Sequence, residues 1–329
     1  MLEKQIPRVM IAGTSSGCGK TTAVCAVLSL LLRRGVKTAA FKCGPDYIDP
    51  MFHRAVTGVD CTNLDPYFCD RDTLCRLLAH RADGHALAVL EGVMGYYDGT
   101  GVTGTANSTY TVASGTDTPV ILTVNAKGAA ASLHAVIEGF LRFVPHSGIT
   151  GVIFNNISAM TYAHLKALCA ARFGSALAVL GYLPRLDETC LLGSRHLGLI
   201  TAAEITDLKD RLGAIADIAE KTLDLDAILA LADTAPALSC TAPEMPALPP
   251  SRIAVARDKA FCFAYSETLA LFEKLGAEIV PFSPLANEPV PDVHGLYLPG
   301  GYPELYADRL ESNTISRNSV RDAVTGGMP

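Results

Sequence analysis

The feature that most constrains the fold is the segment Gly13-Thr14-Ser15-Ser16-Gly17-Cys18-Gly19-Lys20-Thr21-Thr22. It follows a short apolar run, residues 9–12, and precedes a longer one, residues 23–32. This order predicts a strand, a glycine-rich turn and a helix. Backbone N–H groups in such a turn point inward and hold phosphate oxygens, helped by the positive end of the helix. The segment therefore predicts a site for the phosphates of a nucleotide.

The two polar residues at the end of this segment fit the same interpretation. Lys20 is expected to reach the outer phosphates, and the Thr21 hydroxyl to bind Mg²⁺. Five residues separate Gly13 from Gly19, whereas the usual phosphate-loop pattern has four. The core Gly-x-Gly-Lys-Thr is intact and stands between a strand and a helix, so we favour nucleotide binding by all ten residues over a purely structural glycine turn.

Composition limits the classes of function. The chain has 329 residues, 49% of them hydrophobic, and a net charge of −6, which argues against a nucleic-acid partner. The longest apolar run is too short to cross a bilayer, and the N-terminus lacks the apolar core of a signal peptide. The 10 Cys form no CxxC pair. A zinc site at Cys61, Cys69 and Cys75 is less favoured than reduced thiols, and a cytoplasmic location is expected.

A second strand, residues 38–43, follows the first helix closely and predicts a strand–helix–strand unit with a parallel sheet. It leads into Gly44-Pro45-Asp46-Tyr47-Ile48-Asp49-Pro50. Loops at the carboxyl ends of parallel strands form the ligand crevice. Asp46 and Asp49 are therefore candidates to face a bound nucleotide and its Mg²⁺. The alternative is a turn in which Asp makes only local backbone bonds.

Two further strand ends carry candidate polar residues. Residues 86–92 predict a core strand that ends in Glu91, an acid placed to orient the water shell of Mg²⁺. Asn155 ends the predicted strand 151–155, where it could bond a purine edge or equally cap a turn. The tyrosine-containing loop 93–99 could line a substrate pocket or be a simple turn. Residues 61–69 are expected to be irregular.

A proline-rich stretch, residues 234–250, is the candidate linker between domains 1–233 and 251–329. Beyond it the strand and helix pattern restarts. Strands are expected at 253–256, 278–282 and 295–298, with a helix at 266–275. The last of these strands leads into Pro299-Gly300-Gly301.

These motifs together resemble the cobyrinic acid a,c-diamide synthase family of glutamine-dependent corrinoid amidotransferases. The matching stretches cover essentially the whole chain. They are GTSSGCGKTT at 13–22, KCGPDYIDPMFH at 42–53, LEGVMGYYDG at 90–99, GVIFN at 151–155, RHLGL at 195–199, AVARDKAFCFAY at 254–265 and LYLPGGYPELYADRL at 296–310. The phosphate loop is similar to that of dethiobiotin synthetase. The implied fold class is α/β, a phosphate-loop parallel sheet followed by the first part of a class I glutamine amidotransferase domain.

The resemblance also implies an activity and the residues that serve it. The family amidates the c and a acetate groups of cobyrinic acid in cobalamin biosynthesis, through an acyl phosphate made from ATP. It implies that Thr21, Asp46 and Glu91 serve Mg²⁺, and that Lys20, Asp46, Asp49 and Glu91 are catalytic. Tyr47 would contact the corrinoid, and Asn155 would read adenine. Glutamine or ammonia is the nitrogen donor, no nucleic acid or membrane takes part, and the sequence leaves open a homodimer.

The second domain resembles the start of a class I glutamine amidotransferase. By this resemblance the loop at Gly300 and Gly301 would supply an oxyanion-hole N–H. The family's nucleophilic cysteine comes later in the chain, in a strand-to-helix elbow that this sequence does not contain, and Cys262 is not in such an elbow. We therefore expect a C-terminally incomplete chain that cannot hydrolyse glutamine; the sequence leaves open whether its synthetase half works with free ammonia.

Three alternatives compete with this interpretation. A related amidotransferase could act on hydrogenobyrinic acid, a cobyric acid precursor or nickel sirohydrochlorin, since all of these use the same activation chemistry. A partitioning-type ATPase switch is disfavoured by the Pro-Asp-Tyr-Ile-Asp loop, the acidic charge and the second domain. Dethiobiotin synthetase itself is disfavoured by the length of the chain.

Overall fold

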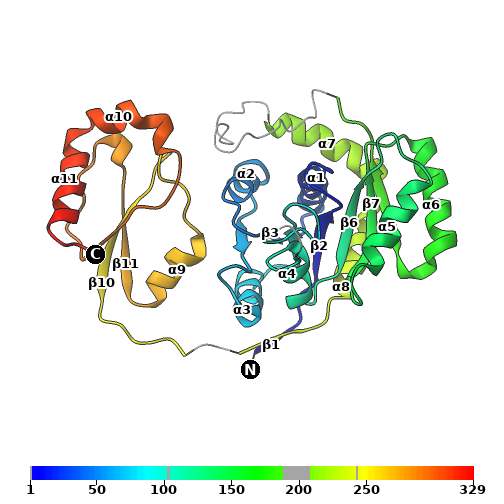
Figure 1. Ribbon diagram of the computed structural model, residues 1–329, viewed down its shortest axis with the longest axis horizontal. Helices are drawn as coiled ribbons and strands as arrows, with labels where there is room; N and C mark the ends of the chain where they lie inside the picture. The colour runs from blue at the N-terminus through cyan, green and yellow to red at the C-terminus, as the bar shows by residue number, and fades with distance from the viewer. Residues whose placement is uncertain (1, 102–103, 188–207, 242–243) are drawn as a thin grey trace. The chain divides into compact units, whose positions relative to one another are not determined.

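The computed structural model describes residues 2–101, 104–187, 208–241 and 244–329. The chain divides into two compact units, Met1–Ala242 and Pro243–Pro329 (Figure 1). Each unit is an α/β structure with a parallel sheet, which confirms the predicted fold class. Among the described residues, no helix is both long and apolar enough to span a bilayer.

The first unit is built on a seven-stranded parallel sheet with the order β4-β3-β5-β2-β6-β7-β8. Its strands are β2 (Arg8–Gly13), β3 (Thr38–Cys43), β4 (Cys61–Leu64), β5 (Leu87–Glu91), β6 (Val120–Asn125), β7 (Ile149–Asn155) and β8 (Ala178–Leu183). The strand that leads into the glycine-rich segment lies at the centre. The ends of β3 and β5 therefore lie beside that segment, as expected for a crevice at the carboxyl edge of a parallel sheet.

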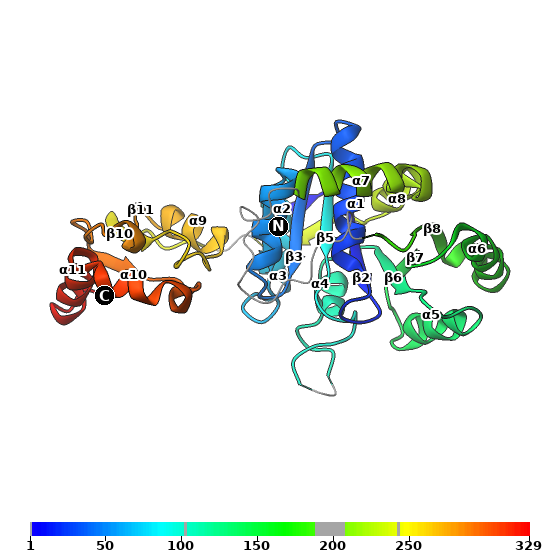
Figure 2. The same ribbon diagram turned by 90° about the horizontal axis from the view of Figure 1, so that it is seen from above.

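Helices cover both faces of this sheet, because each face carries apolar side chains that must be buried. They are α1 (Lys20–Arg33), α2 (Ile48–Thr57), α3 (Arg71–Arg81), α4 (Thr109–Gly115), α5 (Ser132–Arg142), α6 (Ala159–Phe173), α7 (Leu208–Thr222) and α8 (Leu225–Asp233), with a short 3₁₀ helix η1 (Gly174–Ala176). One core joins the sheet to α1, α2, α7 and α8, and the other joins it to α3, α4, α5 and α6. In Figure 2, α7 lies alongside α1, whereas α5 and α6 lie at the end of the sheet that β8 forms.

Two segments differ from the sequence-based expectations. The stretch 61–69 was expected to be irregular, but its first four residues form β4, which pairs in parallel with β3. Ile48, Asp49 and Pro50 were expected to lie in the loop after the second strand, yet they begin α2, which runs to Thr57. Pro50 lies in the first turn of this helix, where a proline is tolerated because the N–H that it lacks would have no helical partner.

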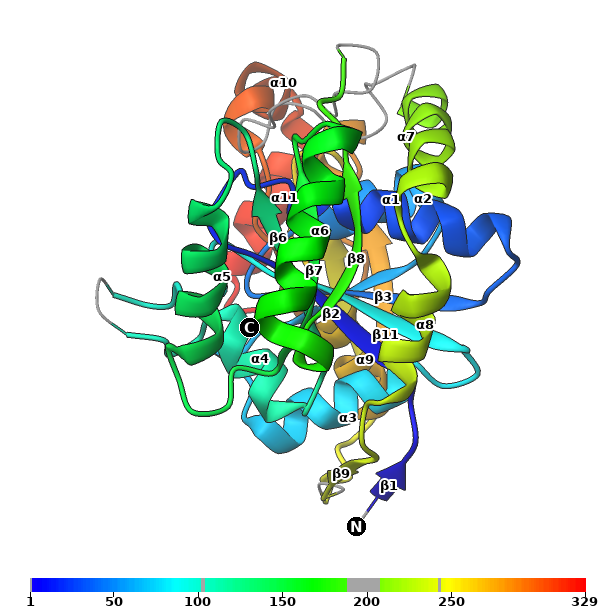
Figure 3. The ribbon, with the colours of Figure 1, turned by 90° about the vertical axis from the view of Figure 1, so that its right-hand side faces the viewer.

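A small antiparallel pair lies apart from the main sheet. β1 (Leu2–Lys4) pairs with β9 (Leu238–Cys240), and Figure 3 shows the two strands side by side. β9 falls inside the stretch 234–250 that was predicted to be a linker. Leu238 and Cys240 are buried against the core of the first unit, so β9 belongs to the fold of that unit and not to a linker.

The central strand begins with an enclosed cation. Arg8 at the start of β2 has no exposed surface. Its guanidinium donates to the carbonyls of Thr116 (2.8 Å), Asp117 (3.2 Å) and Ile6 (3.0 Å). Burial lowers its pKa to about 10. These carbonyls satisfy donors that would otherwise be costly to bury, and they tie the start of β2 to the end of α4.

The second unit is smaller. Its sheet has three parallel strands in the order β11-β10-β12. The elements are β10 (Ser251–Ala256), α9 (Ser266–Lys274), β11 (Ala277–Phe282), β12 (Gly295–Tyr297), α10 (Ala307–Ser312) and α11 (Thr314–Thr325), with 3₁₀ helices η3 (Pro284–Ala286) and η4 (Pro303–Tyr306). A small hydrophobic cluster in this unit contains the buried residues Ala254, Ala256 and Phe282.

Candidate active site

The glycine-rich segment forms a tight loop between β2 and α1. Gly17 and Gly19 have φ of 71° and 103°, values that suit glycine because it lacks a Cβ. At Gly13 a Cβ would overlap the Cys18 sulfur. Lys20 begins α1, and its ammonium donates to the Ser15 carbonyl at 2.9 Å, across the loop. Burial lowers the pKa of Lys20. The backbone and the cation thus have the arrangement that phosphate binding requires.

Three neighbouring strands or loops hold this loop in place. The Thr14 N–H donates to the Thr123 carbonyl of β6 at 3.2 Å, and the Tyr96 N–H donates to the Gly13 carbonyl at 2.8 Å. The buried side chain of Asn155, at the end of β7, donates to the Cys18 carbonyl at 2.9 Å. The amide that was predicted to read adenine thus supports the phosphate loop in the structure, and its contact with adenine stays a prediction.

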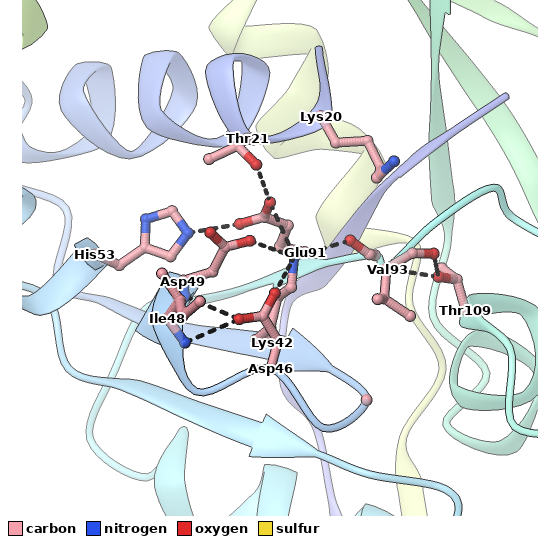
Figure 4. A network of polar contacts seen from close by, with 12 residues as sticks. Lys20, Thr21, Lys42, Asp46, Ile48, Asp49, His53, Glu91, Val93 and Thr109 are labelled. Carbon is pink, nitrogen blue, oxygen red and sulfur yellow. Dashed lines mark hydrogen bonds and ion pairs between the residues drawn. The ribbon is translucent and has the colours of Figure 1, made fainter. Parts of the chain in front are cut away.

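Glu91 lies at the centre of a buried polar cluster beside the loop (Figure 4). One of its carboxylate oxygens, Oε1, accepts from the Thr21 hydroxyl at 2.7 Å and lies 3.2 Å from Lys42 Nζ. The other, Oε2, is 2.6 Å from His53 Nε2. Four elements meet here: α1 supplies Thr21, β3 supplies Lys42, α2 supplies His53 and β5 supplies Glu91.

The two aspartates of the loop after β3 join the same cluster through Lys42. Asp49 Oδ2 accepts from Lys42 Nζ at 2.7 Å, and Asp46 Oδ2 is 3.7 Å from it. Asp46 Oδ1 accepts from the N–H groups of Ile48 (2.9 Å) and Asp49 (3.0 Å). Asp46 thus makes the local backbone bonds that we considered as its alternative role, and it also faces Lys42. Tyr47, between the aspartates, is half-buried.

The charges in this cluster stabilise one another although they are buried. Burial favours neutral Lys42, but the carboxylates of Glu91, Asp49 and Asp46 outweigh it and raise the pKa of Lys42. Burial also opposes the charge on Glu91, yet Lys42, His53 and Thr21 hold the pKa of that carboxyl well below its usual range. For His53, hydrogen bonds with Cys25 and Glu91 overcome burial and raise its pKa to about 10. The cluster is thus a set of charged groups at neutral pH.

These residues suit Mg²⁺ and a nucleotide. Mg²⁺ prefers oxygen ligands and usually keeps water and phosphate oxygens in its shell. The Thr21 hydroxyl, in the first turn of α1, and the Glu91 carboxylate, at the end of β5, supply two such oxygens 2.7 Å apart. Within the described ranges, no three His, Cys, Asp or Glu side chains are grouped so that they could hold a metal ion by themselves.

The loop after β5 is fixed by contacts to its neighbours. The Val93 N–H donates to the Thr109 hydroxyl, which in turn donates to the Val93 carbonyl, both at 2.8 Å. Tyr96 is buried, and its hydroxyl donates to the Ser147 carbonyl at 2.5 Å. The Tyr97 hydroxyl donates to the Phe140 carbonyl at 2.6 Å. These tyrosines pack the loop onto the domain, and a role of the loop in lining a substrate pocket stays a prediction.

Gly300 and Gly301 follow β12 in the second unit. The Gly300 carbonyl accepts from the Phe263 N–H at 2.9 Å. At Gly301 a Cβ would overlap the Ala260 carbonyl oxygen, so this glycine is required for the close approach of two backbone segments. The loop that was expected to supply an oxyanion-hole N–H is thus held against residues 258–263.

Sequence reasoning missed two members of the cluster, Lys42 and His53. Lys42 lies in a strand whose six residues are all buried. A lysine in such a strand signals buried carboxylates nearby, because an unpaired buried charge is very costly. His53 gave a weaker signal, since α2 was not predicted. Arg195 and His196, from the matching stretch 195–199, lie outside the described residues.

Comparisons with known proteins agree with the motifs. The model of the CobQ/CobB/MinD/ParA nucleotide binding domain matches residues 9–200, and that of the CobB/CobQ-like glutamine amidotransferase domain matches residues 252–329. Proteins named cobyrinate a,c-diamide synthase are similar over 98% of this chain. They include one from Gloeobacter violaceus (42% identical, 70% of its length), one from Methanosarcina acetivorans (39%, 68%) and one from Listeria monocytogenes (38%, 72%).

Solved structures give a weaker likeness. The cell division protein FtsY from Thermotoga maritima aligns with 65% of this chain and 69% of its own, at 13% identity and a TM-score of 0.41.

Proposed function

The chain belongs to the cobyrinate a,c-diamide synthase family, and we propose that it takes part in the ATP-dependent amidation of the c and a acetate groups of cobyrinic acid during cobalamin biosynthesis. One observation carries the proposal beyond family membership. The carboxylates of Asp46, Asp49 and Glu91 gather around Lys42 directly beside the phosphate loop. A nucleotide-binding fold needs no such cluster to bind phosphate alone.

The chemistry explains why a phosphate loop serves an amidation. A carboxylate is a poor acceptor for ammonia because its oxygen is a poor leaving group. In the proposed first step, a carboxylate oxygen of the corrinoid attacks the γ-phosphorus of ATP, and the bond from that phosphorus to ADP breaks. Ammonia then attacks the acyl carbon, phosphate leaves, and a proton is lost to give the amide. Each amide formed therefore consumes one ATP and one ammonia and releases ADP, phosphate and a proton.

The residues of the first unit have distinct roles in this proposal. The N–H groups of residues 13–22 and the Lys20 ammonium stabilise charge on the transferred phosphoryl group. Thr21 and Glu91 hold Mg²⁺ together with Asp46; Mg²⁺ neutralises charge between the outer phosphates when it is bound. Asp49, fixed by Lys42, supports the metal or the substrate carboxylate. Tyr47 contacts the corrinoid, and Asn155 binds the adenine edge.

The second unit is proposed to belong to the supply of ammonia from glutamine. Its relatives' domain carries the name of a glutamine amidotransferase. The backbone at Gly300 and Gly301 would stabilise the oxyanion formed when the glutamine amide is attacked. A homodimer and a cytoplasmic location stay predictions from the sequence.

The decisive experiment supplies free ammonia, so that only the first unit is tested. Cobyrinic acid is incubated with the chain, ATP, Mg²⁺ and an ammonium salt, and the corrinoid is examined by mass spectrometry for one or two amidations. We expect amidation that depends on both ATP and Mg²⁺. Hydrogenobyrinic acid and nickel sirohydrochlorin are run in parallel. Amidation of one of these but not of cobyrinic acid, or ATP hydrolysis with no amide formed, would overturn the proposal.

A further inference from the structure

His53 is a buried residue of the cluster to which the proposed chemistry gives no role. It lies on α2 with 1% of its surface exposed. Its Nε2 is 2.6 Å from Glu91 Oε2, and its Nδ1 is 4.0 Å from the Cys25 sulfur on α1. The imidazole thus bridges α1 and the end of β5, as Figure 4 shows for the contact with Glu91.

The two oxygens of Glu91 have separate partners. Oε1 faces Thr21 and Lys42, and Oε2 faces His53. Since both oxygens belong to one rigid plane, the contact at Oε2 sets the rotation of the carboxylate and so the direction in which Oε1 points. Oε1 is the oxygen that meets the first turn of α1, next to the phosphate loop.

Lys42 cannot set this rotation by itself. Its ammonium is shared among Glu91 (3.2 Å), Asp49 (2.7 Å), Asp46 (3.7 Å) and the Gly92 carbonyl (3.2 Å). An ammonium is a compact charge that attracts either oxygen of a carboxylate, whereas an imidazole N–H donates along one direction. Without His53, Oε2 of Glu91 would be a buried acceptor without that donor. If the carboxylate then rotated so that Oε2 faced Lys42, Oε1 would move away from the Thr21 hydroxyl.

We propose that His53 is a positioning residue that holds the Glu91 carboxylate toward Thr21 and thereby sets how tightly the phosphate loop binds a divalent metal with its nucleotide. The proposal rests on the proposed function in one respect, since it takes the phosphate loop to bind ATP with Mg²⁺. Groups that orient a metal ligand from behind typically change metal affinity by about 10–100-fold when they are removed.

The test compares three substitutions at this position in the full chain. Gln carries an amide N–H that reaches the place of Nε2, Asn carries one only near the place of Nδ1, and Leu carries none. Binding of Mn²⁺ in the presence of ATP is followed by electron paramagnetic resonance. Binding of ATP alone, in EDTA, is followed by calorimetry. Neither readout requires amidation or a corrinoid.

We expect the His53→Leu and His53→Asn chains to bind Mn²⁺ about 10–100-fold more weakly in the presence of ATP. Metal-free ATP binding should change less than about threefold, because His53 does not contact the loop backbone in the structure. His53→Gln should restore Mn²⁺ affinity to within about threefold of the unmodified chain. His134→Gln is the matched control, because His134 is also buried but lies on α5 and bonds the Ala131 carbonyl. The His134→Gln chain should bind Mn²⁺ as tightly as the unmodified chain.

Several outcomes would overturn the inference. Unchanged Mn²⁺ affinity in His53→Leu is one, and equal losses in His53→Gln and His53→Leu are another. Equal losses with and without metal would show a structural role only. Circular-dichroism melting identifies any variant that fails to fold. If His53→Leu fails to fold, the comparison of Mn²⁺ affinity between His53→Gln and His53→Asn tests the inference. An unmodified chain that binds neither ATP nor Mn²⁺ overturns the proposed function as well, whereas normal binding in all variants overturns the role of His53 alone.

Discussion

The two units cover their parallel sheets to very different extents. In the first unit all six residues of β2 and of β3 are buried, and helices pack on both faces. In the second unit the three residues of β12 are only partly buried, and neither α9 nor α10 contains a buried residue. Hydrophobic stabilisation is roughly proportional to the apolar area removed from water. The first unit therefore has the larger reserve of stability, and it can hold charged groups in its interior.

This difference shows what a buried charge cluster requires. Glu91, Lys42 and His53 each have 3% or less of their surface exposed. Such groups keep their charges and their positions only where partners approach from every side. In the second unit, Gly300 and Gly301 present backbone, which needs no charged partners. We infer that activation of the carboxylate belongs to the well-packed unit because that chemistry depends on fixed charges.

The largest expected effect tests the assignment of the chemistry to the first unit. Lys20→Ala should lower ATP-dependent amidation with ammonia by at least about 100-fold, because it removes a cation placed to stabilise the transferred phosphoryl group. The matched control is Lys259→Ala, which removes an exposed lysine from the second unit and should leave the rate with ammonia unchanged. Initial rates by mass spectrometry measure both. Equal rates in the two variants would contradict the assignment.

The next effect concerns the fixed charges themselves. Asp49→Asn should reduce amidation by about 100-fold or more, while ATP binding stays within about threefold, because Asp49 forms an ion pair with Lys42 of β3 and the substitution leaves every residue of the phosphate loop in place. Loss of a buried ion-pair partner should also lower the free energy of unfolding by about 3 kcal/mol. Amidation kinetics, calorimetry and urea unfolding give the three measurements. Unchanged turnover would show that Asp49 has no part in the reaction.

A pair of leucines tests the difference in packing. Leu122 on β6 is fully buried, whereas Leu296 on β12 is half-buried. Leu122→Ala should lower the free energy of unfolding of the first unit by about 2–5 kcal/mol. Leu296→Ala should lower that of the second unit by less than about 1.5 kcal/mol, since less area returns to water. Hydrogen exchange with peptide-level mass spectrometry reports each unit separately. Similar losses of unfolding free energy in both units would contradict the inferred difference in packing.

A further expected effect is a pH dependence confined to the first unit. The pKa of His53 is raised from 6.5 to about 10, since its hydrogen bonds outweigh burial. A raised pKa means that protonated His53 stabilises the fold fully below pH 6.5, and that this contribution declines as the pH rises through about 10. The stability advantage of the unmodified chain over His53→Gln should therefore shrink between pH 6.5 and 10. The exchange of β10 should show no corresponding difference between the two chains.

Most of the first unit could be predicted because its sequence pattern and its structure follow the same physical rule. Long apolar runs separated by glycine or polar turns predict buried parallel strands with helical crossovers. β3 has the bounds that the sequence indicated, residues 38–43. β4 was missed because Cys61–Leu64 has only four residues and contains Asn, which is uncommon in strands. It is a strand because it pairs with β3, and pairing is not visible in the local sequence.

The site could be predicted in part for a similar reason. Asp46, Asp49 and Glu91 lie at strand ends, and strand ends converge at one edge of a parallel sheet. The partners of these acids could not be predicted from position. Lys42 lies inside a strand. His53 lies inside α2, a helix that was not predicted because Pro45 and Pro50 favoured a loop. The contacts of both residues with the acids depend on how α2 packs against β3. The positions of these two side chains are set by contacts between residues that are distant in the sequence, and a local sequence pattern does not show such contacts.

Arg8 has a consequence for how the site is assembled. β2 is buried on both faces, so apolar side chains alone distinguish poorly between one alignment with β5 and β6 and an alignment shifted along the strand. A shift would withdraw the guanidinium from the carbonyls of Thr116 and Asp117 and leave it unsatisfied in the interior. Arg8 thus fixes the register of the central strand relative to β5 and β6. The position of Gly13, at the opposite end of β2, therefore depends on a buried side chain outside the phosphate loop.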